Sequence, residues 1–468
     1  MNTTPNRFLE QAAIALDDIQ LQTALERGTG NADSRRRAAM AELADPNAIR
    51  LQGRAARLRG LDDLPDLLEQ AERQIIARGG KVLWAADADE ANRHVLNICR
   101  EHNLRRGVKS KSMATEEIGL LPFLNQHGIE MIETDLGEYI VQLSGSHPSH
   151  IIMPVMHMTK EQIRDLFMEK LAMPYTDDPA DMTAWARKTL REEYLRADFG
   201  MSGGNFIIAE TGSVVIVTNE GNGRLCTSVP PVHIAVVGIE KVIPTWEDFA
   251  TLLQLLCRSG TGQRMSVYAN AFNGPAIPGE PDGPEHFYLI LLDNGRSDIY
   301  ASEYAEALAC IRCGACLNIC PVYQNVGGHA YGATYTGPIG AVITPLLKGK
   351  TNAAPLPFAS TLCGACQEAC PVGINLPEML LKLRRDLQAE QDPVWQMGMK
   401  AFGFGMSHPL LYNVGGRLAS EALQSLGEDA GSDMVNSLPY PLSGWTDHRD
   451  FPVFPEERFR DWWRKNRT

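Results

Sequence analysis

Seven of the chain's ten cysteines lie in two short runs, Cys310-Ile-Arg-Cys313-Gly-Ala-Cys316-Leu-Asn-Ile-Cys320-Pro321 and Cys363-Gly-Ala-Cys366-Gln-Glu-Ala-Cys370-Pro371. Cysteines two residues apart on one tight loop supply thiolates to the irons of a cubane cluster. In two-cluster ferredoxins, the cysteine before a proline ligates the other cluster. The repeated spacing therefore predicts two iron–sulfur clusters and a role in electron transport.

This ligation rule divides the seven thiolates unequally. Cluster 1 would take Cys310, Cys313, Cys316 and Cys370, and cluster 2 would take Cys320, Cys363 and Cys366. When the second run is aligned on its Cys-Pro end, Ser360 stands where a first cysteine would fall. Cluster 2 is therefore one cysteine short.

Several ways of completing cluster 2 stay open. It could be a [3Fe-4S] cluster, or a [4Fe-4S] cluster whose fourth ligand is water, Ser360 or a partner's side chain. A remote cysteine could also complete it, and the candidates are Cys99, Cys226 and Cys257. Each of these lies in an apolar or helical stretch, which is typical of an inert buried thiol.

Zinc sites and disulfides are the competing uses of such runs. A zinc site would take four thiolates, which seven cysteines do not divide into, and zinc motifs do not usually end in Cys-Pro. Disulfides need an oxidising compartment, and the N-terminal Met-Asn-Thr-Thr-Pro-Asn lacks the basic and apolar regions of a signal peptide. We therefore expect a cytoplasmic iron–sulfur protein.

Length and charge narrow the class of protein. A chain of 468 residues exceeds what one core usually serves, so several domains are expected. The net charge of −13 argues against nucleic acid as a partner. No apolar run approaches the roughly 20 residues that span a bilayer, so any membrane association would be peripheral and through partners.

Four segments differ in their patterning. Residues 1–75 are helical in pattern and are interpreted as an accessory layer without a site. Residues 76–300 alternate short apolar runs with amphipathic stretches, which predicts an α/β domain. Residues 301–390 should form an α-helical ferredoxin-type domain, and 391–468 a C-terminal extension whose Trp and Arg residues suit packing or a partner contact.

The α/β segment contains the elements that would position a substrate site. Its candidate strands are Val82–Ala86, a short strand around Val108, Ile129–Glu133, His150–Val155, Phe206–Ala209, Ser213–Thr218, Val232–Val237 and Phe287–Leu292. Its candidate helices include Lys160–Met168, Ala180–Leu195 and Trp246–Leu256. Ligands of such sheets gather in loops at the carboxyl ends of strands.

Polar residues in these loops form a candidate substrate pocket, made of Lys111, Glu138, Glu210, Thr211, Gly212, Glu220 and Arg224. Arg224 offers an anion-binding fork, and the glycines allow close approach of a ligand. A β-hairpin with a glycine turn and a structural salt bridge explains the segment from Glu210 to Arg224 equally simply. No residue stands out as catalytic, and no full dinucleotide fingerprint follows a strand.

Five segments together carry a family resemblance: Lys109–Met113 with Glu116 and Glu117, Glu133–Ile140, Ser149–Pro154, Glu210–Ser213 and Asn219–Arg224. They resemble the LUD domain of lactate-utilisation proteins. Followed by the two cysteine runs, they resemble the LUD-domain iron–sulfur proteins of the bacterial L-lactate oxidation system.

That resemblance implies a fold and a function. The fold would be a LUD domain, similar to sugar-isomerase and CoA-transferase α/β domains, followed by a helical ferredoxin module like that of succinate dehydrogenase iron–sulfur subunits. The function would be electron transfer in an NAD-independent, multi-protein L-lactate dehydrogenase that makes pyruvate and allows growth on lactate. Its cofactors would be two clusters, most often [4Fe-4S], and its partners a cysteine-rich-domain protein and a smaller LUD-domain protein.

Two alternatives remain beside this implication. The chain could be a regulatory or metabolite-sensing iron–sulfur protein. It could also serve the oxidation of another 2-hydroxy acid such as glycolate, because one methyl group separates glycolate from lactate and is worth only about 1–3 kcal/mol in a fitted pocket.

Overall fold

The computed structural model describes residues 4–280, 282–390, 393–430, 433–439, 442–446, 449–455 and 457–467. The chain divides into two compact units, Met1–Leu387 and Gln388–Thr468. The first unit contains both cysteine runs and all the polar segments singled out above.

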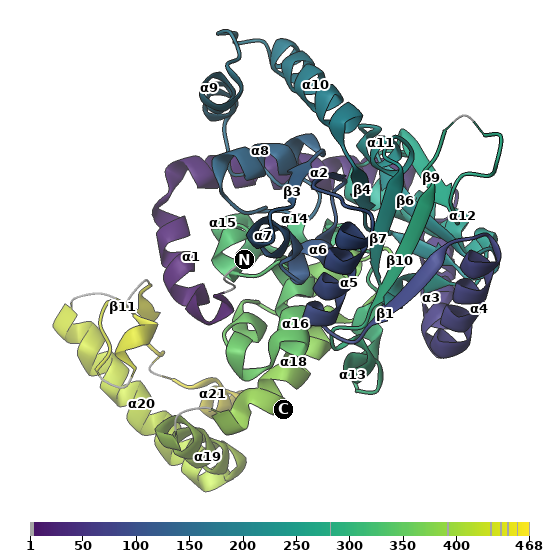
Figure 1. Cartoon of the computed structure of the whole chain (residues 1–468). Coiled ribbons are helices and arrows are strands. Elements are labelled where there is room, and N and C mark those ends of the chain that lie inside the picture. Colours follow the sequence, from purple (N-terminus) through teal and green to yellow (C-terminus); the bar gives the residue numbers. More distant parts are fainter. Residues whose placement is uncertain are drawn as a thin grey trace. The chain divides into compact units, whose positions relative to one another are not determined.

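A six-stranded parallel sheet forms the centre of the first unit (Figure 1). Its strands follow the order β1 (Lys81–Ala85), β10 (His286–Leu292), β7 (Val232–Gly238), β4 (Phe199–Ser202), β2 (Arg106–Lys109) and β3 (Glu130–Glu133). The interior strands β7 and β10 are almost continuous apolar runs because both faces of a parallel sheet are covered.

Alternate residues of β7 point to opposite cores. Ile234 and Val236 pack with α5 (Ala88–Glu101) and α7 (Leu120–Gln126) on one face. Ala235 and Val237 pack on the other face with α4 (Leu64–Ala77) and a second sheet. That sheet has the order β8 (Val242–Ile243), β5 (Phe206–Ile208), β6 (Ser213–Thr218) and β9 (Tyr268–Phe272).

Helices complete the α/β part and its N-terminal layer. The N-terminal helices are α1 (Phe8–Asp17), α2 (Ile19–Ala41) and α3 (Pro46–Asp62). The other helices of the α/β part are α6 (Met113–Glu117), α8 (Leu136–Ser144), α9 (Lys160–Leu171), α10 (Pro179–Arg196), α11 (Asn222–Ser228), α12 (Trp246–Gly260) and α13 (Arg296–Tyr300).

Short helices surround the cysteine runs. They are α14 (Ala315–Asn318), α15 (Pro321–Val326), α16 (Gly337–Lys348), α17 (Ala365–Ala369) and α18 (Leu376–Asp386), with the 3-10 turns η3 (Ala305–Ala309) and η6 (Leu356–Phe358). Side chains of these helices share one buried core with α1, α2, α3 and α12. The cluster module is thereby built into the same unit as the sheets.

The second unit has its own small core. It contains α19 (Pro393–Ser407), α20 (Pro409–Ala430), β11 (Met434–Val435), β12 (Phe451–Pro452) and α21 (Phe459–Asn466). Leu423, Val435 and Leu438 are buried together there. Within the described residues, no helix is both long and apolar enough to cross a bilayer.

Most predicted strands and helices are present, with ends shifted by a few residues, but one strand prediction is wrong. His150–Val155 forms bends and turns instead of a strand. The Nδ1 atom of His150 accepts hydrogen bonds from the N–H groups of Ile152 and Met153, at 3.0 and 3.1 Å. This local bonding replaces a β ladder, although Ile151 is buried as an apolar strand residue would be.

Candidate iron–sulfur centres and an adjoining cavity

The first cysteine run is shaped by one glycine. Gly314 has a φ of 76°, a left-handed conformation that suits glycine, and it caps the N-terminus of α14. The turn separates Cys310 and Cys313, which precede it, from Cys316, which lies in α14. Three thiols can thus surround one space.

Thiols from the two runs fall into two electrostatic groups. Burial and then the thiols of Cys370 and Cys310 raise the pKa of Cys313, and burial followed by Cys310 and Cys313 raises that of Cys316. In the other group, burial and then Cys320 and Cys363 raise the pKa of Cys366. One group thus contains Cys310, Cys313, Cys316 and Cys370 and the other Cys320, Cys363 and Cys366, with an interaction between Cys316 and Cys366 that joins the two groups.

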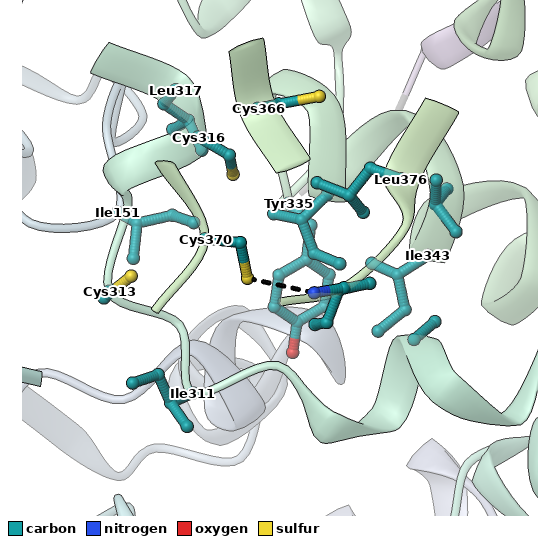
Figure 2. Close-up of a cluster of buried hydrophobic side chains, with 14 of the residues drawn as sticks. Ile151, Ile311, Cys313, Cys316, Leu317, Tyr335, Ile343, Cys366, Cys370 and Leu376 are labelled. Carbon is teal, nitrogen blue, oxygen red and sulfur yellow. Dashed lines mark hydrogen bonds between the residues drawn. The ribbon is translucent and has the colours of Figure 1, made fainter. Parts of the chain in front are cut away.

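The two groups adjoin each other inside an apolar environment. Figure 2 shows Cys313, Cys316, Cys366 and Cys370 among apolar side chains such as Leu317 and Leu376. Cys316 also interacts electrostatically with Cys366. Five of the seven thiols are buried, whereas Cys310 is half-buried and Cys363 is exposed. In number and chemistry, the thiols suit two neighbouring iron–sulfur clusters, with one ligand missing from the second.

Of the three remote cysteines, Cys257 shares the buried core of the cysteine runs, whereas Cys99 and Cys226 lie in other cores. Cys99 is buried in the core beneath α5, and Cys226 lies 3.3 Å from the Thr134 hydroxyl. Cys257 accepts a hydrogen bond from the N–H of Ser266 at 3.2 Å. In the part of the chain that the structure describes, no group of three or more His, Cys, Asp or Glu side chains is arranged to hold a single metal ion.

Arginines of α3 hold the cysteine loops in place. Arg50 donates to the carbonyl oxygens of Cys370 and Glu368, at 2.9 and 2.8 Å. The buried Arg57 donates to the carbonyls of Leu308 and Ala309, just before Cys310. The N-terminal segment therefore does more than the accessory role predicted from its pattern.

A cavity of about 720 Å³ lies beside the first cysteine loop. Its wall includes Asn31 and Arg35 from α2, in the N-terminal segment that was predicted to be an accessory layer without a site. Residues after β4, residues 216–220 and Asn222 line it as well. Ile311 and Arg312, which lie between Cys310 and Cys313, complete this wall.

Cationic side chains line the cavity next to the cysteine loop. Arg312 lies with its guanidinium 4.5 Å from the centre of the Tyr335 ring, and its Nη2 lies 3.7 Å from Glu240. Lys241 donates to the carbonyl of Cys310 at 3.4 Å, and burial lowers the pKa of Lys241 to about 8. Lys111 lies 3.4 Å from Glu138. These groups favour an anionic ligand.

Several buried polar atoms of the cavity wall have no hydrogen-bond partner among the described residues. They are Nη1 of Arg312, both amide atoms of Asn222 and the hydroxyl of Thr218. Unsatisfied buried polar atoms are rare in folded proteins because they cost free energy. A ligand with both acceptor and donor groups would satisfy them.

A chain of buried ion pairs supports this wall. Arg296 donates to Glu240 at 2.6 Å and to Glu117 at 2.7 Å, and the hydroxyl of Tyr335 donates to Glu117 at 2.6 Å. Burial opposes the charge on Glu240, but Arg296, Lys241 and Arg312 lower its pKa to about 2. These ion pairs connect α6, α13 and the cluster module.

A second polar group is buried under the sheet's carboxyl edge. Lys109 lies 2.8 Å from Glu133, and Glu116 and Glu138 lie near both lysines of this segment. Burial, reinforced by Glu138, raises the pKa of Glu116 to about 8. Burial likewise raises the pKa of Glu133 to about 7. The raised pKa values favour the protonated carboxyl groups of Glu116 and Glu133 up to near neutral pH.

The predicted pocket residues are separated in the structure. Lys111 and Glu220 line the cavity, while Glu138 lines a small neighbouring pocket together with Lys111. Arg224 is exposed on α11. Glu210 and Thr211 accept hydrogen bonds from Trp246, and Gly212 packs against Gln74 of α4. These last four residues are not among those that line the cavity.

Residues that the sequence did not single out complete the cavity. Arg312, Lys241 and Arg296 come from three distant segments, so spacing could not connect them. Only Arg312 carried a signal, because its place between two cysteines puts it beside a cluster.

Comparisons with known proteins agree with this architecture. The LUD domain profile matches residues 68–292, the 4Fe-4S dicluster domain profile matches 306–374, and the profile of lactate utilisation protein B, C-terminal, matches 382–468. A solved DUF162 family protein from Deinococcus radiodurans is 14% identical, with a TM-score of 0.29 over 49% of this chain and 98% of that chain, a likeness too distant to bear on the fold.

Full-length relatives are much closer. Lactate utilization protein B from Bacillus licheniformis is 44% identical and covers 100% of this chain and 98% of its own. The protein of the same name from Bacillus subtilis is 43% identical with the same coverage. That from a Geobacillus species is 44% identical and covers 98% of this chain and 97% of its own.

The fold and the cysteine loops define a LUD-domain iron–sulfur protein, in which an α/β domain is followed by a 4Fe-4S dicluster module. With relatives this similar over its whole length, the chain belongs to the lactate utilization protein B family. The family resemblance and the fold class predicted from the sequence are thereby confirmed.

Proposed function

We propose that this protein is an iron–sulfur electron-transfer subunit of a complex that oxidises L-lactate to pyruvate. The names of its relatives and the dicluster domain support this function. The observation that supports this function most directly is that the first cysteine loop forms part of the cavity wall. Ile311 and Arg312 line the cavity and also lie between two of the proposed cluster ligands. A substrate in the cavity would lie beside cluster 1.

The cavity's chemistry suits a small 2-hydroxy acid. A carboxylate fits the unpartnered Nη1 of Arg312, since guanidinium and carboxylate form strong charge-assisted hydrogen bonds. The hydroxyl group can bond to Asn222 or Thr218, whose polar atoms are also unpartnered. Conversion of lactate to pyruvate releases two electrons and two protons. Two clusters held by these cysteines would supply two one-electron acceptors, and the protons would pass to solvent.

The cysteines are assigned as the sequence predicts. Cluster 1 is held by Cys310, Cys313, Cys316 and Cys370, and cluster 2 by Cys320, Cys363 and Cys366, in a module within 301–390. The two electrostatic groups of thiols support this division. Iron–sulfur clusters supply one-electron acceptors of tunable potential, which burial and hydrogen bonds to sulfur adjust.

Electrons would leave through cluster 2. Cys363 is exposed, whereas Cys313, which follows the cavity-lining residue Arg312, and Cys316 are buried. The exposed side chain of Phe358 lies close to this second loop in sequence. This face suits docking of the proposed partners, a cysteine-rich-domain protein and a smaller LUD-domain protein.

Anaerobic absorbance spectroscopy tests the function. The protein is purified with and without its partners, and the visible cluster absorbance is followed after addition of L-lactate or glycolate. We expect bleaching by L-lactate in the partnered sample only. Clusters that dithionite reduces but lactate never reduces in the complex would contradict the proposal and favour a sensor. Bleaching by glycolate alone would identify a different 2-hydroxy acid.

A further inference from the structure

The two cysteine runs repeat each other residue by residue at an interval of fifty positions. Cys313, Cys316 and Cys320 correspond to Cys363, Cys366 and Cys370, and each run ends in proline. By the same interval, Cys310 corresponds to Ser360. The backbone conformation of the two loops repeats in the same way.

Hydrogen bonds after the turn repeat in both loops. Gly314 accepts from the N–H groups of residues 317 and 318, at 3.0 and 3.3 Å, and residue 320 donates to residue 317 at 3.2 Å. Gly364 accepts from residues 367 and 368, at 3.0 and 3.1 Å, and residue 370 donates to residue 367 at 3.2 Å. The two turns therefore have the same backbone course.

The segment before each turn repeats as well, including an uncommon conformation. Arg312 has a φ of 59° and Leu362 a φ of 56°, although neither is glycine. Residues other than glycine rarely adopt this left-handed conformation, because it costs about 1–3 kcal/mol of backbone strain. Those that do adopt it concentrate at functional sites. Gly314 and Gly364 follow with φ values of 76° and 84°.

The side chains of Cys310 and Ser360 occupy matching places in these loops. The N–H of Arg312 donates to Sγ of Cys310 at 3.4 Å, and the N–H of Leu362 donates to Oγ of Ser360 at 3.1 Å. In both loops a hydrogen bond from the second following residue thus directs the side-chain atom toward the turn. Both residues are half-buried.

Cations fix the two backbones in the same way. Lys241 donates to the carbonyl of Cys310 at 3.4 Å, and Arg384 donates to the carbonyl of Ser360 at 2.9 Å. Arg384 also holds the carbonyl of Pro357 at 2.8 Å. A cation beside either loop favours an anionic ligand at the matching side chain.

We propose that Oγ of Ser360 is the fourth protein ligand of cluster 2, in the place that Cys310 has in cluster 1. Ligation exchanges the hydroxyl proton for iron, and the proton passes to solvent. The proposal rests on the assignment of Cys320, Cys363 and Cys366 to that cluster. Cluster 2 is then a [4Fe-4S] cluster with three thiolates and one alkoxide.

Spectroscopy and iron analysis of Ser360→Ala and Ser360→Cys test this ligand in the full-length protein, prepared anaerobically. The unsubstituted protein should contain about eight irons per chain. Ser360→Ala should contain about seven, and its oxidised form should show the paramagnetic resonance signal of a [3Fe-4S] cluster. Ser360→Cys should keep about eight irons and raise the reduction potential of cluster 2, because thiolate is a softer donor than alkoxide.

Ser302→Ala is the matched control. The Ser302 hydroxyl also accepts a hydrogen bond from the N–H two residues later, at 3.1 Å, but lies outside the cysteine loops. It should keep about eight irons and an unchanged spectrum. About seven irons in the unsubstituted protein, or an unchanged cluster in Ser360→Ala, would overturn the proposal and leave the proposed function standing. About four irons would overturn the assignment of cluster 2 itself.

Discussion

Arg312 connects the chemistry of the cysteine run with that of the cavity. Its backbone lies between two proposed cluster ligands, while its Nη1 is buried beside the cavity without a partner. One residue can therefore place a bound carboxylate next to cluster 1.

Replacing Arg312 should weaken substrate binding without removing the clusters. We expect Arg312→Gln to raise the KM for L-lactate in the partnered complex by roughly 10- to 100-fold, the loss expected for a hydrogen bond between charged groups. Steady-state kinetics, with iron content measured in parallel, checks this. Arg224→Gln is the control, since Arg224 is exposed and away from the cavity wall. An unchanged KM in Arg312→Gln would place the substrate elsewhere.

Glu116 should make the stability of the protein depend on pH. Burial raises its pKa from 4.5 to about 8 in the folded state. The folded protein therefore holds a proton that the unfolded chain has already released between these pH values. By linkage, the free energy of unfolding should fall as the pH rises from about 4.5 to about 8.

The variant Glu116→Gln should remove much of this fall. Denaturant unfolding at several pH values should show it to be more stable than the unsubstituted protein at pH 8, with the difference shrinking toward pH 5. Glu69→Gln, at an exposed position of α4, is the control and should follow the unsubstituted protein. If both variants keep the same pH dependence, Glu116 is not the proton-binding group.

At the scale of elements, α3 acts as a brace between the sheets and the cluster module. Arg57 is buried and donates to the carbonyls of Glu240, Val242, Leu308 and Ala309. Burial lowers the pKa of Arg57 to about 10, so it remains charged at neutral pH. Four carbonyls from two segments thus depend on one guanidinium.

Arg57→Met should destabilise the protein by at least about 3 kcal/mol, because it leaves several buried carbonyls unpaired. Iron content should fall as well, since Leu308 and Ala309 lead directly into Cys310. Denaturant unfolding and iron analysis check both effects. Arg73→Met, at an exposed position of α4, is the control. Normal stability and iron content in Arg57→Met would show that α3 does not brace the loop.

The strands β6 and β4 show which elements the sequence pattern predicts and which it misses. The predicted strand Ser213–Thr218 matches β6, because a continuous run of β-branched apolar residues between glycine-containing turns marks it locally. The four residues of β4 were not predicted, although they pair with both β2 and β7. So short a segment carries little periodicity, and its pairing partners lie far away in sequence.

At the scale of the whole molecule, binding of the clusters should contribute to the free energy of folding. The cysteine loops and the N-terminal helices share one core, and cluster binding adds to the stability of the state that binds it. Removing iron with an anaerobic chelator should lower the melting temperature and expose residues 301–387 to protease before the sheets. Limited proteolysis with mass spectrometry checks this, and reconstitution with iron and sulfide should reverse it. Identical cleavage with and without iron would contradict it.

By itself, the sequence determined the cysteine chemistry, the α/β class and the family resemblance. Ligand spacing and hydrophobic periodicity are local, so they can be interpreted within a few residues. The alignment of the two runs on Cys-Pro also shows that the second run has Ser360 where the first has Cys310.

Only the tertiary structure decided which polar residues share a site. It separated Glu210, Thr211 and Gly212 from Lys111 and Glu220, and it brought Asn31 of α2 and Arg312 to the same cavity. Parallel strands pair through long crossovers, so residues far apart in sequence meet at one edge of the sheet. Burial and unpaired polar atoms likewise arise from packing, which no local pattern records.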